Sequence, residues 1–273
     1  MSNFEKYAGY YDLLYGSKDY AGEVSYMIRI IRSWSPSAAD VLELGTGTGR
    51  HGHLLAEHGF NVHGIDRSRE MDAIARENAP QGCAGSFTCQ VGDICAVRLD
   101  RSFDAVVALF HVVCYQISNE ALRATFETAA AHLRSGGLFL FDAWHGPAVR
   151  AQPPSVRTKT VSDAKRRVTR NAMPLVRSDS NVVEVVYNLE CEDLNSGLIE
   201  RFSETHPMRF IFLEEVERLA GETGLRLVQM EEFMTGVAPS DATWSVLYAL
   251  QLLSTQPTCA KPAGVSASFR TIT

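Results

Sequence analysis

Alternating glycines at positions 45, 47 and 49 are the part of the chain best suited to bind a ligand. A short apolar run at residues 41–44 comes directly before them and is typical of a buried strand. Residues 50–58 carry apolar side chains at helical spacing and stop at Gly59, a residue type that favours the end of a helix. A strand, a glycine turn and a helix in this order let backbone N–H groups approach a ligand closely. The pattern therefore predicts a ligand-binding turn over residues 45–49.

A carboxylate follows the next predicted strand. Asp66 ends the strand predicted at 61–65 and lies about twenty residues after Gly45. At that spacing a carboxylate meets the ribose hydroxyls of a nucleoside bound over the glycine turn. Asp66 therefore points to a ligand that contains a nucleoside.

The glycine spacing argues against a dinucleotide cofactor. The dinucleotide fingerprint is G-x-G-x-x-G, but here Arg50 occupies the place of its third glycine, which permits tight helix–strand packing. The stretch from Glu43 to Gly49 instead resembles the first motif of class I S-adenosylmethionine (SAM) methyltransferases. Gly-Asp at 92–93 and Leu-Arg-Ser-Gly-Gly-Leu-Phe at 133–139 also resemble that family. The resemblance implies an α/β, Rossmann-like fold in which a seven-stranded sheet has helices on both faces.

The same resemblance implies SAM as the cofactor. In this family the glycine turn wraps the methionine part, and the acid after the second strand holds the ribose hydroxyls. Asp93 is then expected to accept from the exocyclic amine of adenine, although an alternative role is to cap the turn that follows it. The cofactor-binding residues that the resemblance implies are Tyr11, Tyr15, Glu43, Leu44, Gly45, Thr46, Gly47, Asp66, Arg67, Met71, Gly92, Asp93, Ile94, Leu109, Phe110, His111 and Tyr115.

Tyrosines are dense in residues 7–20, and Tyr11 and Tyr15 share a face if this segment is helical. Tyr-Asp-Leu-Leu-Tyr followed by Lys-Asp-Tyr resembles the N-terminal segment of enzymes that N-methylate nucleotide-linked amino sugars, where it covers the cofactor as a lid. Tyrosine faces and hydroxyls can surround a sulfonium without a competing positive charge, which makes Tyr11 a candidate catalytic residue. The alternative is an amphipathic helix whose tyrosines only pack on the core.

Histidines follow two predicted strands on the ligand side of the sheet. The nearly continuous apolar run at 103–110 is typical of a central parallel strand, and His111 comes directly after it. Because imidazole titrates near neutrality, His111 is a candidate general base, with a structural role at the rim as the alternative. Asp142 and His145, after the strand predicted at 138–141, are further catalytic candidates of second rank. One local carboxylate is too few for an oxygen-ligand metal site, so no metal is expected.

Residues 146–206 differ in texture from the rest of the chain. Prolines cluster at their start, and short strands are predicted at 155–161, 166–171, 181–191 and 198–205. We interpret the segment as an antiparallel β insertion after the fifth strand. In amino-sugar methyltransferases an insertion at this point forms part of the substrate site and of a subunit interface, which implies a homodimer. Its arginines could clamp a diphosphate, but a solvated hairpin with alternating charge is the preferred interpretation. These arginines are Arg150, Arg157, Arg166, Arg167, Arg170 and Arg177.

The methyltransferase domain is predicted to span residues 1–254, with final strands at 225–233 and 244–252, and residues 255–273 are predicted to be a flexible tail. The net charge of −6 weighs against a nucleic-acid partner. There is no apolar signal segment and no run that could cross a membrane, and six scattered cysteines without a C-x-x-C pair fit a reducing, cytoplasmic location.

Together these features predict SAM-dependent methyl transfer to an N or O atom of a small molecule, such as an amino sugar or another secondary metabolite. The loop at 111–115 lacks the Asp/Asn-Pro-Pro-aromatic signature of enzymes that methylate the planar amines of bases or glutamine. Two alternatives remain: a non-catalytic SAM-binding or scaffold protein, and an NAD-dependent oxidoreductase.

Overall fold

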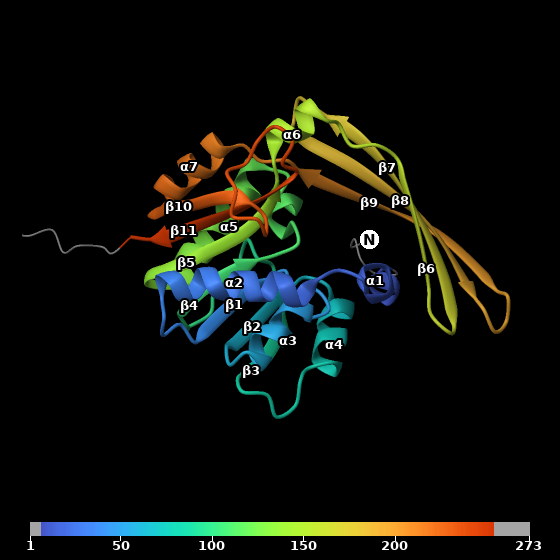
Figure 1. Ribbon diagram of the computed structural model, residues 1–273, viewed down its shortest axis with the longest axis horizontal. Helices are drawn as coiled ribbons and strands as arrows, with labels where there is room; N and C mark the ends of the chain where they lie inside the picture. Colours follow the sequence, from blue (N-terminus) through green and yellow to red (C-terminus); the bar gives the residue numbers. More distant parts are fainter. Residues whose placement is uncertain (1–6, 254–273) are drawn as a thin grey trace, which may run out of the picture.

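A seven-stranded sheet organises the chain, and the computed structural model describes residues 7–253 of it (Figure 1). The strand order is β10-β11-β5-β4-β1-β2-β3. β1 pairs in parallel with β2 and β4, whereas β11 runs antiparallel to both β5 and β10. The strands are β1 (Asp40–Leu44), β2 (Asn61–Asp66), β3 (Ser86–Val91), β4 (Phe103–Ala108), β5 (Leu133–Trp144), β10 (Leu225–Glu232) and β11 (Ser245–Leu252). The predicted Rossmann-like, seven-stranded sheet is confirmed, and its two final strands form an antiparallel pair.

Helices cover both faces of this sheet, as predicted, because each presents one apolar stripe to it. Met27 of α2 and Leu55 of α3 pack on one face, and Phe126 of α5 and Leu219 of α7 pack on the other. α4 packs against β2 and β3. The helices are α2 (Tyr20–Trp34), α3 (Arg50–Glu57), α4 (Arg69–Glu77), α5 (Asn119–His132) and α7 (Leu213–Glu222).

Two central strands differ in length from their predictions. β4 ends at Ala108, because Phe110 and His111 have φ angles of 66° and 63°, in the left-handed region that a strand cannot use. A short 3-10 helix, η1 (Val112–Tyr115), follows them. β5 begins at Leu133, ahead of the predicted position 138, directly where α5 ends.

A second, four-stranded sheet of order β6-β7-β8-β9 lies between β5 and α7 in the sequence. All of its pairings are antiparallel, so the predicted β insertion after the fifth strand is confirmed. Its last strand extends to Arg209, past the predicted end of the insertion at 206. The elements are α6 (Gly146–Ala151), β6 (Arg157–Ser162), β7 (Arg166–Arg177), β8 (Val182–Asp193) and β9 (Ile199–Arg209).

α1 (Ala8–Tyr15) lies beside the second sheet (Figure 1). The side chain of Lys159 donates to the Leu14 carbonyl at 2.5 Å, and that of Arg166 donates to the Gly9 carbonyl at 3.1 Å. On its other side, Asp12 accepts a 2.9 Å hydrogen bond from the Thr48 hydroxyl in the glycine turn. α1 therefore links the second sheet to the ligand edge of the main sheet.

The structure can be searched for membrane-spanning helices and for clusters of metal-binding side chains. Within residues 7–253, no helix is both long enough and apolar enough to cross a bilayer. In the same part of the chain, no group of three or more His, Cys, Asp or Glu side chains is arranged to hold a metal ion. The predicted flexible tail at 255–273 lies outside the described residues.

Candidate active site

A cavity of about 690 Å³ opens where the parallel strands of the main sheet end. Its wall comes from the main sheet, from α1 and from the second sheet. Most of the predicted site residues line it, namely Tyr11, Tyr15, Gly45, Thr46, Gly47, Asp66, Arg67, Met71, Gly92, Asp93, Ile94, Leu109, Phe110, His111 and Tyr115. Glu43, Leu44 and His145 do not.

The glycine turn between β1 and α3 forms one side of the cavity. Gly45, Gly47 and Gly49 have φ angles of 72°, 54° and 83°, which residues other than glycine adopt only with strain. The N–H groups of Gly45 and Thr46 both donate to the Ile65 carbonyl, at 2.7 Å and 3.0 Å. These bonds join the turn to the end of β2. The turn is therefore held open, with its backbone at the cavity surface.

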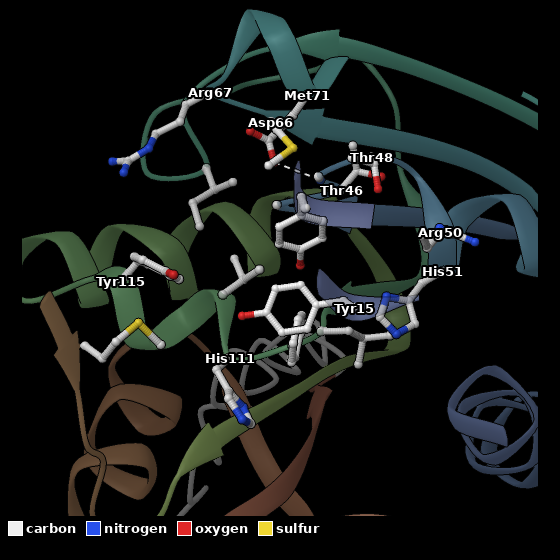
Figure 2. Close-up of a pocket in the computed structure, with 18 of the residues that line it drawn as sticks. Tyr15, Thr46, Thr48, Arg50, His51, Asp66, Arg67, Met71, His111 and Tyr115 are labelled. Carbon is white, nitrogen blue, oxygen red and sulfur yellow. Dashed lines mark hydrogen bonds between the residues drawn. The ribbon is translucent and has the colours of Figure 1, made fainter. Parts of the chain in front are cut away.

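Asp66 completes that connection from β2. Its Oδ2 accepts from the Gly47 N–H at 2.8 Å, and its Oδ1 accepts from the Ser68 N–H at 2.9 Å (Figure 2). Burial raises the pKa of the Asp66 carboxyl, although these two backbone hydrogen bonds oppose the shift. A carboxylate at a cavity wall, with one lone pair on each oxygen still open, suits a diol such as ribose.

Glu43 and Leu44 lie behind the turn. Leu44 is fully buried in the core, and Glu43 is 2% exposed. The Glu43 carboxylate accepts from the Thr46 hydroxyl, and a side chain at Gly52 would clash with it. Glu43 therefore stabilises the turn through its hydrogen bond to Thr46 and does not itself line the cavity.

Replacing Glu43 with glutamine is expected to change how stability depends on pH. Burial raises the pKa of Glu43 from 4.5 to about 7, and the nearby Asp66 charge adds to the shift, whereas the Thr46 hydroxyl opposes it. The folded protein keeps this proton up to near pH 7 and the unfolded chain releases it near pH 4.5, so stability falls as pH rises between these values. Across that range the wild type should lose roughly 3 kcal/mol relative to Glu43→Gln.

Urea unfolding at pH 4.5, 6 and 7.5 measures this difference. Glu57→Gln, at the exposed end of α3, is the control and should follow the wild-type curve. Parallel curves for the wild type and Glu43→Gln contradict the assignment of a buried, proton-holding carboxyl.

Asp93 has the capping role that the sequence left as an alternative. Its Oδ1 accepts from the Cys95 N–H at 2.8 Å, and its carbonyl accepts from the N–H groups of Ala96 and Val97. Asp93 also lines the cavity beside Gly92 and Ile94. The capping bond fixes the carboxylate at the cavity edge, and it does not exclude contact with an adenine amine.

The tyrosines of α1 lie over the cavity but pack on the second sheet. Leu14 and Tyr7 form a buried cluster with Val168 and Leu189 of that sheet. The Tyr15 ring meets Phe110 edge-on, with ring centroids 5.0 Å apart. The tyrosines thus pack on a core, as the alternative interpretation has it, but that core belongs to the second sheet, and Tyr7, Tyr11 and Tyr15 also line the cavity.

A half-buried arginine joins these tyrosines. The guanidinium of Arg170, on β7, donates to the hydroxyls of Tyr7 and Tyr15 at 3.0 Å and 2.8 Å. It also lies 4.7 Å from the centre of the Tyr187 ring, a cation–π distance. Arg170 thus connects α1, β7 and β8 at the cavity wall.

His111 meets a buried carboxylate. The backbone N–H of His111 donates to Oδ1 of Asp142 at 3.1 Å, and Nδ1 of its imidazole ring lies 2.5 Å from Oδ2 of the same carboxylate. Burial opposes ionisation of Asp142, but the charge and hydrogen bonding of His111 outweigh it and hold the pKa of Asp142 below its usual value. The left-handed backbone at His111 permits this approach. A ring held in this way leaves Nε2 as the nitrogen that can meet a substrate, which is the geometry of a base with its orienting carboxylate.

His145 does not reach the cavity. β5 ends at Trp144, which lines the cavity, whereas His145 lies past the strand at the start of α6 and does not line it. Its Nδ1 lies 3.2 Å from the Thr243 carbonyl, and the residue is 6% exposed. The structure therefore does not bring His145 together with the other predicted catalytic residues.

Several lining residues were not singled out in the sequence analysis. Thr48 lies inside the predicted turn and His51 two positions after it, so including the whole turn and the start of the following helix finds both. Arg157, Arg170 and Tyr187 come from the second sheet, for which a solvated hairpin was preferred. Four of the six arginines noted in that segment do not line the cavity: Arg166, Arg167 and Arg177 pair with acids, and Arg150 donates to Asn181. Arg157 and Arg170 do line it.

The chain is similar to known methyltransferases over most of its length. The family described as "Methyltransferase domain" matches residues 41–137. A dTDP-3-amino-3,4,6-trideoxy-alpha-D-glucopyranose N,N-dimethyltransferase of Streptomyces venezuelae is 31% identical over 228 residues, which cover 82% of this chain and 92% of that protein. A dTDP-3-amino-3,6-dideoxy-alpha-D-glucopyranose N,N-dimethyltransferase of Streptomyces fradiae is 30% identical, with coverage of 83% and 84%.

Solved structures share the fold. DesVI of Streptomyces venezuelae has a TM-score of 0.75 at 28% identity, with 89% of this chain and 97% of that chain covered. SAM-bound CalS10, an amino pentose methyltransferase from Micromonospora echinaspora, has a TM-score of 0.72 at 24% identity, with coverage of 92% and 98%.

Proposed function

This chain belongs to the SAM-dependent methyltransferases, and on that premise we propose that it methylates the amino group of a nucleotide-linked amino sugar. Arg157 carries the proposal. It lines the cavity from the start of β6, its side chain is exposed, and it has no ion pair among the described residues. A cation in this position fits an acceptor that carries a diphosphate. The two Streptomyces relatives at 31% and 30% identity are named as methyltransferases of dTDP-linked amino sugars, and this supports the same acceptor class.

The cavity fits SAM. A Cβ at Gly45 would lie 2.5 Å from both Cγ atoms of Val112, so the turn keeps room that only glycine allows. The hydroxyl of Tyr20, which also lines the cavity, is buried and has no hydrogen-bond partner among the described residues, which suits one end of a polar ligand. When bound, SAM supplies the methyl group as an electrophile.

Residues of this chain then hold the two partners. Asp66 takes the ribose hydroxyls, and Asp93 takes the adenine amine, with Ile94 and Met71 against the ring. The glycine turn, whose residues Gly45, Thr46 and Gly47 line the cavity, lies against the methionine part. The other residues that the sequence predicts to bind SAM are proposed to contact it if they line the cavity, which excludes Glu43 and Leu44.

Alignment is the main catalytic contribution of such a site. Well-oriented reactants gain about 7–11 kcal/mol relative to reaction in free solution. Tyr11 and Tyr15 offer ring faces that tolerate a sulfonium and keep water away from it. His111, oriented by Asp142, takes the proton that an amino sugar carries at neutral pH and so exposes the nitrogen lone pair.

Mass spectrometry of the reaction product tests the function. The purified chain with SAM is expected to add methyl groups to a dTDP-linked amino sugar, and not to the same sugar with a hydroxyl in place of the amine. Transfer to neither, or equal transfer to both, overturns the proposal.

Arg157→Ala is expected to raise KM for the dTDP-linked acceptor by about tenfold to a hundredfold, because a charged hydrogen bond to phosphate is lost. KM for SAM and kcat should stay close to wild type. Arg167→Ala is the matched control, since Arg167 pairs with Glu192 and does not line the cavity. An unchanged KM for the acceptor in Arg157→Ala rules out a phosphate contact at this residue.

The homodimer and the cytoplasmic location expected from the sequence stay predictions. Sedimentation of the purified chain measures the first, and cell fractionation measures the second.

A further inference from the structure

A histidine and a tyrosine meet where α2 and α3 border the cavity. His51 is the second residue of α3, and Tyr20 is the first residue of α2. Both side chains line the cavity, and their rings meet edge-on with centroids 4.9 Å apart. His51 is 6% exposed and is among the lining side chains shown in Figure 2. The two residues therefore form one part of the cavity wall, next to the glycine turn.

A carboxylate decides which ring nitrogen of His51 carries the proton. Nε2 of His51 lies 2.7 Å from Oε2 of Glu23, and the side chain of Lys18 contacts the same oxygen. Burial opposes ionisation of Glu23, but the hydrogen bonds from His51 and Lys18 outweigh it and hold the pKa of Glu23 below its usual value. An ionised carboxylate can only accept, so a neutral His51 ring carries its proton on Nε2 and keeps Nδ1 as an acceptor.

Nδ1 of His51 and the Tyr20 hydroxyl have no hydrogen-bond partner among the described residues. Burial lowers the pKa of His51 although Glu23 opposes the shift, so the ring is neutral near pH 7.5. Burial raises the pKa of Tyr20, so its hydroxyl keeps its proton. A buried hydroxyl without a partner costs stability until a ligand pairs with it. This part of the wall thus offers one acceptor, on His51, and one donor, on Tyr20.

The charged groups around these two residues are paired with one another. Lys18 pairs with Glu23, and Arg50 pairs with Asp12. Arg157 on the second sheet, by contrast, lines the cavity and has no ion pair among the described residues. An unpaired cation suits an anion, whereas an acceptor and a donor within balanced charges suit a zwitterion.

The order of the strands separates the two ends of SAM. Asp66 ends β2 and Asp93 follows β3, both on one side of β1 in the sheet. The side chain of Lys18 lies over the ring of Phe110, which follows β4 on the other side of β1. A cofactor whose nucleoside is held by Asp66 and Asp93, as proposed above, therefore directs its amino-acid end across the glycine turn toward Lys18 and its neighbours.

We propose that His51 and Tyr20 recognise the zwitterionic amino-acid end of SAM. Nδ1 of His51 accepts a hydrogen bond from the ammonium group, and the Tyr20 hydroxyl donates to the carboxylate. Glu23 positions His51 by holding its proton on the other ring nitrogen. The site then distinguishes SAM from methylthioadenosine, which has the same nucleoside but no amino-acid end. This inference concerns the cofactor and does not depend on the nature of the acceptor.

Titration calorimetry with three ligands tests the role of His51. The ligands are the demethylated product of SAM, the same molecule without its ammonium group, and methylthioadenosine. Glutamine at position 51 can still donate to Glu23 but has no acceptor at the place of Nδ1. His51→Gln should therefore weaken binding of the demethylated product by about tenfold to a hundredfold. Its affinity for the other two ligands should stay within about threefold of the wild type.

His53→Gln is the matched control. His53 lies on the same helix, bonds to the Ala75 carbonyl and does not line the cavity, so this variant should bind all three ligands as the wild type does. Unchanged affinity of His51→Gln for the demethylated product overturns the proposal. An equal loss for all three ligands, in a variant that unfolds at the wild-type temperature, overturns it as well.

Tyr20→Phe tests the other half of the proposal by removing one oxygen. Binding of the demethylated product should weaken about tenfold, and binding of an analogue without the carboxylate should not change. Tyr248→Phe is the control, since its hydroxyl is also buried without a partner among the described residues but does not line the cavity. This control should bind both ligands normally. If Tyr20→Phe loses the same affinity for both ligands, the hydroxyl does not meet the carboxylate and the proposal is overturned.

Nitrogen NMR of the ligand-free enzyme tests the proton placement on His51. The signals of this ring are those absent from the spectrum of His51→Gln. Near pH 7.5 the wild-type ring should carry one proton, on Nε2, and Glu23→Gln should give a mixture of both tautomers, because an amide can donate as well as accept. A wild-type ring with its proton on Nδ1, or with protons on both nitrogens, overturns the proposal.

Discussion

Asp66→Ala is expected to weaken SAM binding about a hundredfold or more. A carboxylate that accepts from two ribose hydroxyls gains about 1.5–3 kcal/mol from each bond. The same substitution also removes the acceptor that holds the Gly47 N–H at 2.8 Å, so the glycine turn loses its fixed position. Loss of the ribose hydrogen bonds and loss of the turn's position both weaken the binding of SAM. Titration calorimetry with SAM and with its demethylated product measures the effect.

Two further variants separate the causes. Asp66→Asn keeps one oxygen acceptor and the side-chain shape, so its affinity should lie between those of the wild type and Asp66→Ala. Asp100→Asn changes an exposed carboxylate after β3 and should bind SAM as the wild type does. Equal affinity of Asp66→Ala and the wild type would remove Asp66 from the cofactor site.

Gly45→Ala is expected to destabilise the protein and to weaken SAM binding at least tenfold. A residue with a Cβ is destabilised by about 1–2 kcal/mol at the φ of 72° found here. The new Cβ would also lie 2.5 Å from both Cγ atoms of Val112. Relief of that overlap must move either the glycine turn or η1. A shift of η1 also disturbs His111, which precedes it and is bonded to Asp142. Overpacking of this kind typically adds about 1–3 kcal/mol.

The chain offers a matched control for backbone strain. Gly82 has a φ of 66°, and a Cβ there would meet nothing within 4 Å. Gly82→Ala should therefore show the conformational cost alone, with SAM affinity unchanged. Adding Val112→Ala to Gly45→Ala should recover part of the lost stability, because it removes the two overlapping carbons. If thermal unfolding shows equal losses for Gly45→Ala and Gly82→Ala, the close approach to Val112 does not matter.

The sequence by itself determined the main sheet and its ligand-binding turn. Each of these parts is coded locally: an apolar run gives a strand, alternating glycines give left-handed backbone, and Asp66 follows the next strand directly. Parallel strands end at one edge, so residues after several strands meet there whatever the details of packing. This is why most of the predicted cavity residues line the cavity. Where the predictions differ, as at the end of β4, the cause is backbone at Phe110 and His111 that no periodicity reveals.

Only the tertiary structure decided which distant side chains share the cavity. Arg170 meets Tyr7 and Tyr15 across more than 150 positions of the sequence, and Tyr115 meets His206 across 91. A hydrophobic pattern indicates that one face of a helix is buried, but it does not indicate which element covers that face. The packing of α1 on the second sheet could therefore not be predicted from the sequence. Likewise, His111 and His145 look alike as residues after strands. The fold brings Asp142 of β5 to His111, whereas His145, past the end of β5, meets the Thr243 carbonyl instead.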